Sequence, residues 1–204
     1  MTEDTRERFL TATAKLLQER GYRGASLNDI LAESGAPRGS LYYHFPGGKE
    51  ELAQEATRRE VRMISDYLAT AFRECAGSVE AVRAYVEGAR EHARSGGFLL
   101  GCPVASLVLD SPEASSSIRD LCEEALDEWH ALILDGLTAG GIPAERAGTL
   151  ATLILTSGEG ALIVARSRRD SKPLDAVADE LAAAVSTALR ESAGAANEGA
   201  QGAR

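Results

Sequence analysis

The chain has 204 residues, of which 44% are hydrophobic and 26% are charged, and its formal net charge is −9. This length can bury the core of one or two domains. The sequence contains no run of about 18 apolar residues that predicts a transmembrane helix, and its charged N-terminus lacks the apolar segment of a signal peptide. Three cysteines without a Cys-x-x-Cys spacing (Cys75, Cys102 and Cys122) indicate reduced thiols in a cytoplasmic protein.

Two helices are predicted near the N-terminus. Residues 4–20 form the first, and its inner side consists of Phe9, Leu10, Ala14, Leu16 and Leu17. Ser26 is a good N-cap for the second helix, and Asp29, three residues later, approximates a capping box. Gly35 suits the left-handed conformation that commonly ends a helix.

A third short helix follows, with Pro37 tolerated in its first turn. Leu41 and Phe45, four residues apart, are expected to face the core. The other side chains of the segment fall wholly or partly outside that stripe. Two short helices joined by a tight turn that contains glycine form the helix-turn-helix pattern, whose second helix enters the major groove of DNA.

The chemistry of the third helix suits DNA. Arg38 can bond to a guanine edge or a phosphate, and Gly39 permits close approach of the backbone. The hydroxyl and imidazole groups can donate to phosphate oxygens, as can Lys49 at the start of the next helix. A capped helix N-terminus is itself a phosphate site. The candidate DNA-binding residues are Ser26, Pro37, Arg38, Gly39, Ser40, Tyr42, Tyr43, His44 and Lys49.

Two considerations weigh against this prediction. The run 41–45 also fits a half-buried amphipathic helix with ordinary aromatic packing, and the net charge opposes DNA binding. However, residues 1–59 carry nine basic and nine acidic side chains, so the whole charge of −9 lies in residues 60–204. Since salt screens charges beyond about 8 Å, a neutral segment with locally clustered Arg and Lys can still bind DNA.

The rest of the chain is predicted to be helical, so the expected fold class is all-α. The predicted helices are residues 49–74, residues 79–95 capped by Ser78, a helix from Ser111–Pro112 to Gly140–Gly141, residues 143–168 and residues 174–191. Leu52, Ala56, Met63 and Tyr67 mark one face of the first of these. Residues 98–109 are expected to begin as a loop, and the Ala/Gly-rich residues 192–204 as a disordered tail.

The last two helices suggest assembly. Residues 149–165 are apolar nearly all round, and Gly158, Gly160 and Ala161 permit close approach of a neighbour. An intramolecular core explains part of this pattern. A four-helix interface between two copies, formed by residues 143–168 and 174–191 of each chain, explains it better.

Residues 5–53 resemble the N-terminal domain of the TetR family of transcriptional regulators. The matching segments are 8–10, 14–17, 21–22 with Ser26, Ile30, Gly35, 39–45 and 49–52. The link between Phe45 and Lys49 is one residue longer than in most members. Together with the segment Gly101–Cys102–Pro103–Val104, it resembles the LmrA/YxaF-like branch of repressors that respond to antibiotics and flavonoid-like compounds. Pro37 stands where Ser or Thr often caps the recognition helix, so one phosphate contact common in the family is missing.

The resemblance implies a helix-turn-helix domain at residues 1–48 and a ligand-binding and dimerisation domain at residues 49–191. It also implies a small-molecule pocket within the helical bundle, to which several apolar residues and a few polar groups are assigned. Each apolar member also fits a plain core. The candidate ligand-binding residues are Phe98, Cys102, Leu126, Trp129 and Glu159, with Leu99, Val104, Leu107 and His130 as further possible liners.

The expected function is that of a dimeric repressor, released from a palindromic operator by a small hydrophobic or aromatic molecule. No cofactor is expected. The spacing of Cys102, Cys122 and His130 matches no standard zinc pattern, and no catalytic motif is evident. Two alternatives remain: a helical small-molecule carrier with a non-functional DNA head, and an enzyme acting in the bundle pocket.

Overall fold

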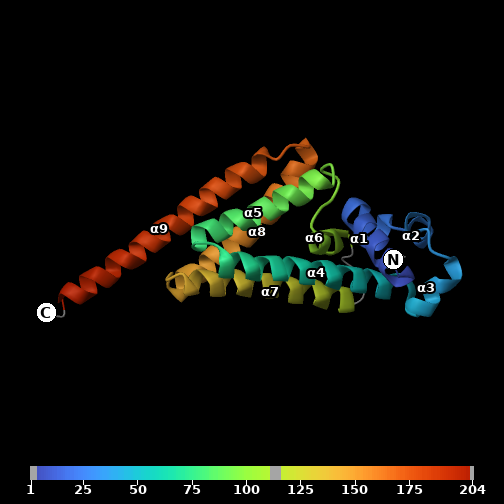
Figure 1. Ribbon diagram of the computed structural model, residues 1–204, viewed down its shortest axis with the longest axis horizontal. Coiled ribbons are helices and arrows are strands. Elements are labelled where there is room, and N and C mark those ends of the chain that lie inside the picture. Colours follow the sequence, from blue (N-terminus) through green and yellow to red (C-terminus); the bar gives the residue numbers. More distant parts are fainter. Residues whose placement is uncertain (1–3, 111–115, 203–204) are drawn as a thin grey trace. The chain divides into compact units, whose positions relative to one another are not determined.

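A computed structural model of the chain describes residues 4–110 and 116–202, with side chains described as far as residue 195 (Figure 1). These residues form helices and no strands, which confirms the all-α prediction. The helices are α1 (Thr5–Gly24), α2 (Leu27–Ser34), α3 (Arg38–His44), α4 (Gly48–Glu74), α5 (Ser78–Ser95), α6 (Pro103–Asp110), α7 (Ser116–Ala139), α8 (Ala144–Arg168) and α9 (Lys172–Gly202).

The described helices form two compact units. The first comprises Met1–Ile64 and Leu99–Leu126, and the second comprises Ser65–Phe98 and Asp127–Arg204. Neither unit is continuous in sequence, because α4 and α7 each contribute to both. These units are defined by packing, whereas the domains predicted from the sequence, residues 1–48 and 49–191, are contiguous, because periodicity along a helix does not reveal where its packing partners change.

The first unit is built around α1, which packs against α2, α3 and α6. The rings of Phe9 and Phe45 meet edge to face, with centroids 6.1 Å apart. All the inner positions predicted on α1 are buried, as are Leu41 and Phe45. The core of the predicted helix-turn-helix segment is therefore confirmed.

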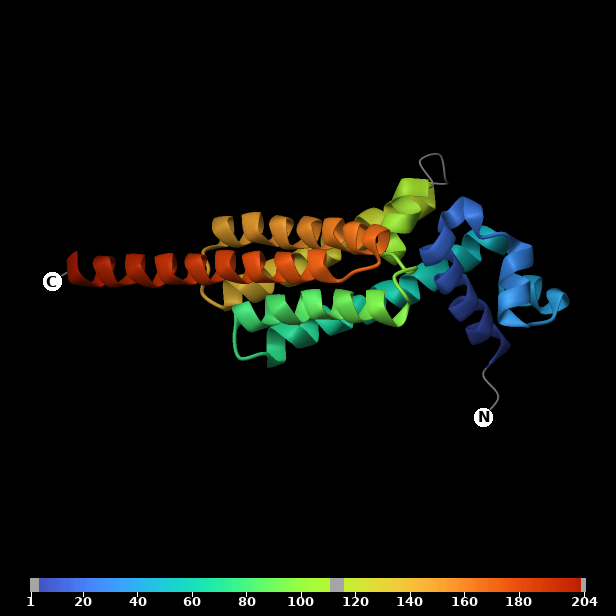
Figure 2. The same cartoon turned by 90° about the horizontal axis from the view of Figure 1, so that it is seen from above.

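The second unit is a bundle in which α5, α8 and α9 pack on one another (Figure 2). Glycines allow some of these helices to approach closely: a Cβ added at Gly158 of α8 would lie 2.7 Å from Tyr85 Oη of α5. Trp129 is buried in this unit, and its indole N–H donates to the Ser65 hydroxyl at 3.2 Å.

The prediction for the inner face of α4 is half wrong. Leu52 and Ala56 are buried, but Met63 is 60% exposed and Tyr67 is 43% exposed. Val61 and Leu68 are buried instead. The buried face turns around the helix axis because the first part of α4 packs in one unit and the second part in the other.

Several predicted helix ends also require correction. Ser78 is the first residue of α5 and not its cap, because Gly77 occupies the N-cap position. Helix α9 begins at Lys172 and continues to Gly202, beyond the predicted end at residue 191, and both views show it extending past α5 and α8 (Figures 1 and 2). Residues 192–202 therefore continue the helix that was expected to end in a disordered tail. The predicted helix start at Ser111–Pro112 lies outside the described residues.

Helix α8 is long and apolar enough to cross a membrane by length and composition alone. However, nearly half of its most apolar stretch is buried within the chain, where it packs against α5 and α9. A core helix of a globular bundle passes the same test.

Candidate nucleic-acid interface

Ser26 fixes the start of α2 through reciprocal hydrogen bonds. Its hydroxyl accepts a bond from the backbone N–H of Asp29 at 3.1 Å, and the Asp29 carboxylate accepts one from the backbone N–H of Ser26 at 3.2 Å. Hydrogen bonds from the Ser26 side chain and backbone lower the pKa of the Asp29 carboxyl. The predicted capping box is therefore confirmed, and Ser26 is exposed beside the helix N-terminus.

The turn between α2 and α3 consists of residues 35–37. Gly35 ends α2 with φ = 57°, the left-handed conformation predicted for it. The guanidinium of Arg8 in α1 donates from Nε and Nη2 to the Ser34 carbonyl oxygen at 2.9 and 2.6 Å. These bonds satisfy a carbonyl at the end of α2 and fasten the turn to α1.

Pro37 was predicted to lie within the first turn of α3, but it is the N-cap residue that precedes this turn. Its backbone is extended (φ = −63°, ψ = 134°) and it provides no side-chain cap. Its carbonyl oxygen instead accepts bonds from Ser40, at 3.0 Å from the backbone N–H and at 2.6 Å from the hydroxyl. The Ser40 hydroxyl proton is thus already engaged within the helix.

The orientation of α3 follows from its two buried anchors. Leu41 and Phe45 are no more than 1% exposed, whereas Tyr42 is 58% exposed and Tyr43 is 82% exposed. Arg38 and Gly39 are also exposed, and a Cβ at Gly39 would meet no atom within 4 Å. Phe45 therefore packs in the core as the alternative of a half-buried helix expects, but Tyr42 and Tyr43 do not and remain accessible to a partner.

The remaining polar groups of α3 lie close to this exposed face. Tyr43 and His44 stack edge to face with ring centroids 5.0 Å apart, and His44 is half-buried. Arg38 Nη1 donates to the side-chain oxygen of Asn28 at 3.3 Å. Asn28 is exposed on α2 and was missed by the sequence analysis, although its position two residues after the Ser26 cap indicates that it lies near the turn.

Lys49 does not extend freely into solvent. It is half-buried, its ammonium group donates to the Tyr22 carbonyl oxygen at 2.6 Å, and Nζ lies 4.4 Å from the centroid of the Tyr22 ring. Burial lowers the pKa of the Lys49 ammonium, and the negative charge of Asp110 opposes that shift. Neither Tyr22 nor Asp110 was predicted to act on Lys49, because both lie far from it along the chain.

Comparison with known proteins identifies the family. Residues 9–56 match the bacterial regulatory proteins of the tetR family, and residues 78–180 match the LmrA/YxaF-like C-terminal domain of transcriptional regulators. The chain belongs to the TetR family. It is a DNA-binding, helix-turn-helix transcriptional regulator, and the predicted LmrA/YxaF-like branch is confirmed.

Individual relatives support this assignment. The HTH-type transcriptional regulator LmrA of Bacillus subtilis is 35% identical over 171 residues, which cover 84% of this chain and 91% of LmrA. The HTH-type transcriptional regulator YxaF of the same organism is 32% identical over 178 residues, with coverage of 87% and 93%. The crystal structure of a TetR transcriptional regulator from Chloroflexus aurantiacus superimposes with a TM-score of 0.77 at 28% identity, covering 89% of this chain and 94% of that one.

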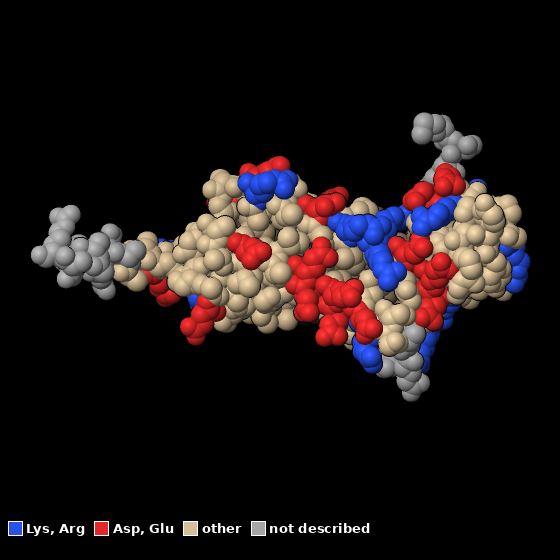
Figure 3. Space-filling model, turned by 90° about the horizontal axis from the view of Figure 1, so that it is seen from below, with Lys and Arg blue, Asp and Glu red and all other residues tan. Residues whose placement is uncertain are grey.

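Acidic side chains are unevenly distributed along the chain of this TetR-family regulator. Residues 34–49, which span the turn and α3, contain Arg38 and Lys49 and no carboxylate. Figure 3 shows a face of the molecule on which acidic side chains gather. Helix α7 carries a group of exposed carboxylates, namely Asp120, Glu123, Glu124, Asp127 and Glu128. The negative net charge is therefore separated from the candidate interface along the chain.

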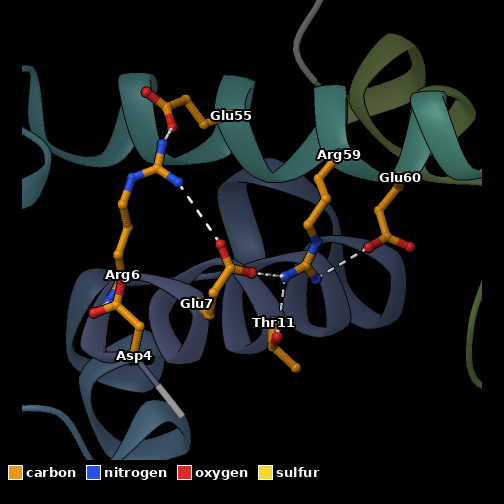
Figure 4. Close-up of polar contacts among 7 residues, drawn as sticks. All are labelled: Asp4, Arg6, Glu7, Thr11, Glu55, Arg59 and Glu60. Carbon is orange, nitrogen blue, oxygen red and sulfur yellow. Dashed lines mark hydrogen bonds and ion pairs between the residues drawn. The ribbon is translucent and has the colours of Figure 1, made fainter.

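Ion pairs join α1 to α4 in the same unit (Figure 4). Arg6 pairs with Glu55, and Glu7 pairs with Arg59 at 3.2 Å. The Arg6 guanidinium carbon also lies 5.5 Å from the centroid of the Phe45 ring, at the end of α3. These contacts fix the beginning of α4 relative to the helix-turn-helix segment of this regulator.

The candidate effector-binding residues are divided between the two units. Trp129 is buried and Glu159 is half-buried in the second unit, where Phe98 adopts a left-handed backbone with φ = 61°. Cys102 and Leu126 belong to the first unit, where Cys102 is buried and Leu126 is half-buried.

A groove of about 500 Å³ lies elsewhere in the second unit, between residues 83–90 of α5 and 174–179 of α9, and none of the candidate effector-binding residues lines it.

The cysteines form no disulfide, and burial raises the pKa of the Cys122 thiol to about 11. Within the described residues, no three His, Cys, Asp or Glu side chains cluster in a way that could hold a metal ion.

Proposed function

We propose that this TetR-family regulator is a dimeric repressor that binds a palindromic operator and is released by a small hydrophobic or aromatic molecule. The observation that carries the proposal is the exposure of Tyr42, Tyr43 and Arg38 on α3, while Leu41 and Phe45 anchor the same helix in the core. Hydroxyl and guanidinium groups on an exposed helix suit phosphate oxygens and base edges. The full DNA-binding set is Ser26, Pro37, Arg38, Gly39, Ser40, Tyr42, Tyr43, His44 and Lys49.

The proposed dimer forms through residues 143–168 and 174–191 of each chain. One face of α8 is buried against its own chain, but the other exposes Leu153, Ile163 and Val164 to 44%, 53% and 39%. Gly160 is exposed on the same helix, with nothing within 4 Å of an added Cβ. Such an apolar face suits a second copy of the chain. A two-fold dimer would present its α3 helices to successive major grooves, about 34–36 Å apart.

The proposed division of labour assigns DNA binding to residues 1–48 and effector binding with dimerisation to residues 49–191. Phe98, Cys102, Leu126, Trp129 and Glu159 are the proposed effector-binding residues. An effector shifts the protein only by its differential affinity for the free and the DNA-bound states. A coupling free energy of about 3 kcal/mol would lower operator affinity about 150-fold, which is enough for induction.

Location and chemistry complete the proposal. Membership of a family of transcriptional regulators supports a cytoplasmic protein without enzymatic activity or cofactor. The packing of α8 within its own bundle supports the same location.

The test is operator binding by the purified protein, measured as fluorescence anisotropy with DNA taken from upstream of its own gene. We expect salt-dependent binding, because counterions are released from DNA when phosphates are contacted. One compound from a panel of aromatic antibiotics and flavonoids should release the DNA. Absence of binding at low salt, across this and neighbouring promoters, would favour a helical small-molecule-binding protein with a non-functional DNA head.

A further inference from the structure

The end of α1 contains a turn that only glycine allows. Gly21 has φ = 73° and ψ = 178°, a conformation that side chains rarely permit. The carboxylate of Asp110, the last residue of α6, occupies the space that a side chain at Gly21 would need. A Cβ there would lie 2.7 Å from Asp110 Oδ2 and 3.0 Å from Asp110 Cγ. The same Oδ2 accepts a hydrogen bond from the backbone N–H of Arg23.

This turn also contains the partner of Lys49. Tyr22, between the two residues that Asp110 contacts, accepts the hydrogen bond from the Lys49 ammonium and lies under it with its ring. The residue before Lys49, Gly48, adjoins α3: a Cβ on Gly48 would lie 3.7 Å from the Tyr42 ring. Hydrogen bonds therefore link the end of α6 to the Tyr22 turn and that turn to Lys49, whose neighbour Gly48 adjoins the Tyr42 side chain of α3.

We infer that Asp110 is a positioning residue for the DNA-binding surface: its carboxylate holds the Gly21–Arg23 turn, and Tyr22 in that turn holds Lys49 beside α3. This inference rests on the proposed DNA-binding function. All of these residues belong to the same compact unit. A second tie supports the arrangement, because the backbone N–H of Gly101, just before α6, donates to the Gln18 carbonyl oxygen at 3.3 Å. The charge of Asp110 also acts on the Lys49 ammonium, whose pKa it raises against the effect of burial.

The main test is a double-mutant cycle on the full-length protein, with operator affinity as the readout. Asp110→Ala and Lys49→Ala should each weaken binding, and the double variant should bind within about twofold of Lys49→Ala, since coupled residues are not additive. Asp110→Ala should also reduce the slope of log affinity against log salt by about 0.9 for each lost phosphate contact. Fully additive effects would overturn the inference, because they would mean that Asp110 acts only through general stability. A normal salt slope in Asp110→Ala would do the same.

A conservative variant at residue 110 tests whether the hydrogen bond to the Arg23 N–H or the negative charge of Asp110 is needed. Asp110→Asn keeps an oxygen that can accept the Arg23 N–H, so it should restore the operator affinity that Asp110→Ala loses. Leu109→Ala is the matched control, because the neighbouring Leu109 is 73% exposed, and it should bind like the parent. If Asp110→Asn binds as weakly as Asp110→Ala, the held turn is not the cause.

Amide hydrogen exchange provides a readout that needs neither the alanine variant nor DNA. The Arg23 amide should be protected in the parent and in Asp110→Asn, because its N–H is bound by residue 110. Exchange as fast as exposed backbone in the parent would overturn the inference. If the parent protects Arg23 but binds no operator, the proposed function fails while the structural link holds.

Discussion

Exposed aromatic side chains distinguish the surface of α3 from the other described helices of its unit. Tyr42 and Tyr43 stand in solvent although aromatic side chains gain much by burial, and their neighbours Leu41 and Phe45 are fully enclosed. A tyrosine contributes an apolar ring and a polar hydroxyl, which together suit a partner that offers both phosphate oxygens and base edges. At the scale of residues, the candidate DNA-binding surface of α3 consists of the side chains that its buried anchors leave outside the core.

Tyr43 and Lys49 give a direct test of this surface. We expect the variant Tyr43→Ala with Lys49→Ala to bind operator at least tenfold more weakly, because hydrogen bonds to charged groups contribute about 1.5–3 kcal/mol each. The oligomeric state and effector affinity should not change. Fluorescence anisotropy with operator DNA measures the loss, and light scattering checks the oligomer. Met63→Ala, exposed on α4, is the control. Parent-like affinity of the double variant would show that the DNA-binding surface lies elsewhere.

At the scale of elements, caps and close contacts decide where helices begin and how closely they pack. Helix α2 depends on the capping box of Ser26 and Asp29, and α3 begins without any side-chain cap. Helix α8 approaches α5 at Gly158. Each of these features leads to a measurable effect on stability.

The capping box predicts a dependence of stability on pH. The folded state lowers the pKa of Asp29 through hydrogen bonds from Ser26. A depressed pKa means that this stabilisation is present above the pKa of the unfolded chain and is lost as the pH falls through the folded value. Ser26→Ala should cost about 1 kcal/mol of unfolding free energy at neutral pH and weaken the acid dependence. Urea unfolding between neutral and acidic pH measures both quantities. If the parent and Ser26→Ala lost the same unfolding free energy on acidification, the hydrogen bonds between Ser26 and Asp29 would not be the cause of the acid dependence.

Gly158 of α8 and Gly194 of α9 form a matched pair of helical glycines. Gly158→Ala should destabilise the protein by about 1–3 kcal/mol, because its Cβ would meet the Tyr85 ring and overpack the contact with α5. Gly194→Ala meets nothing within 4 Å, lies outside the proposed dimer segments, and should stabilise α9 by up to about 1 kcal/mol. Thermal unfolding at one fixed protein concentration compares them. Equal stability of the two variants would show that α5 and α8 are not in close contact at Gly158.

At the scale of the whole molecule, the exposed apolar face of α8 is the feature that a single chain leaves unexplained. Its opposite face is buried against α5 and α9, so the helix is apolar on two sides. In the proposed dimer, a second copy covers the side that one chain leaves in solvent. In that dimer, two copies of α3 would contact one operator, so dimerisation would strengthen DNA binding.

A charge on this face should separate the two copies. Ile163→Glu would bury an unpaired carboxylate at the proposed interface, so we expect a monomer at concentrations where the parent is a dimer. Operator affinity should fall with it, because one half-site alone is contacted. Sedimentation or light scattering measures the mass. Met63→Glu adds the same charge at an exposed position of α4 and should remain a dimer; a dimeric Ile163→Glu variant would exclude α8 from the interface.

Sequence alone determined the features that depend on residues close together in the chain. The Ser26 capping box, the left-handed Gly35, the inward pair Leu41 and Phe45 and the all-α class follow from local hydrogen bonds, glycine conformation and helical period. The same information predicted most of the α3 surface, since a helix with two buried anchors leaves most of its other positions outside the core.

Only the tertiary structure decided what depends on distant partners. Lys49 binds a carbonyl 27 residues away, and Asp110 binds an amide 87 residues away, and no local pattern records either pairing. The buried face of α4 changes where the helix leaves one compact unit and enters the other. The helical periodicity of its sequence cannot indicate this change. Local backbone preferences act within a few residues, whereas these pairings depend on which helices pack together, and packing is a property of the whole folded chain.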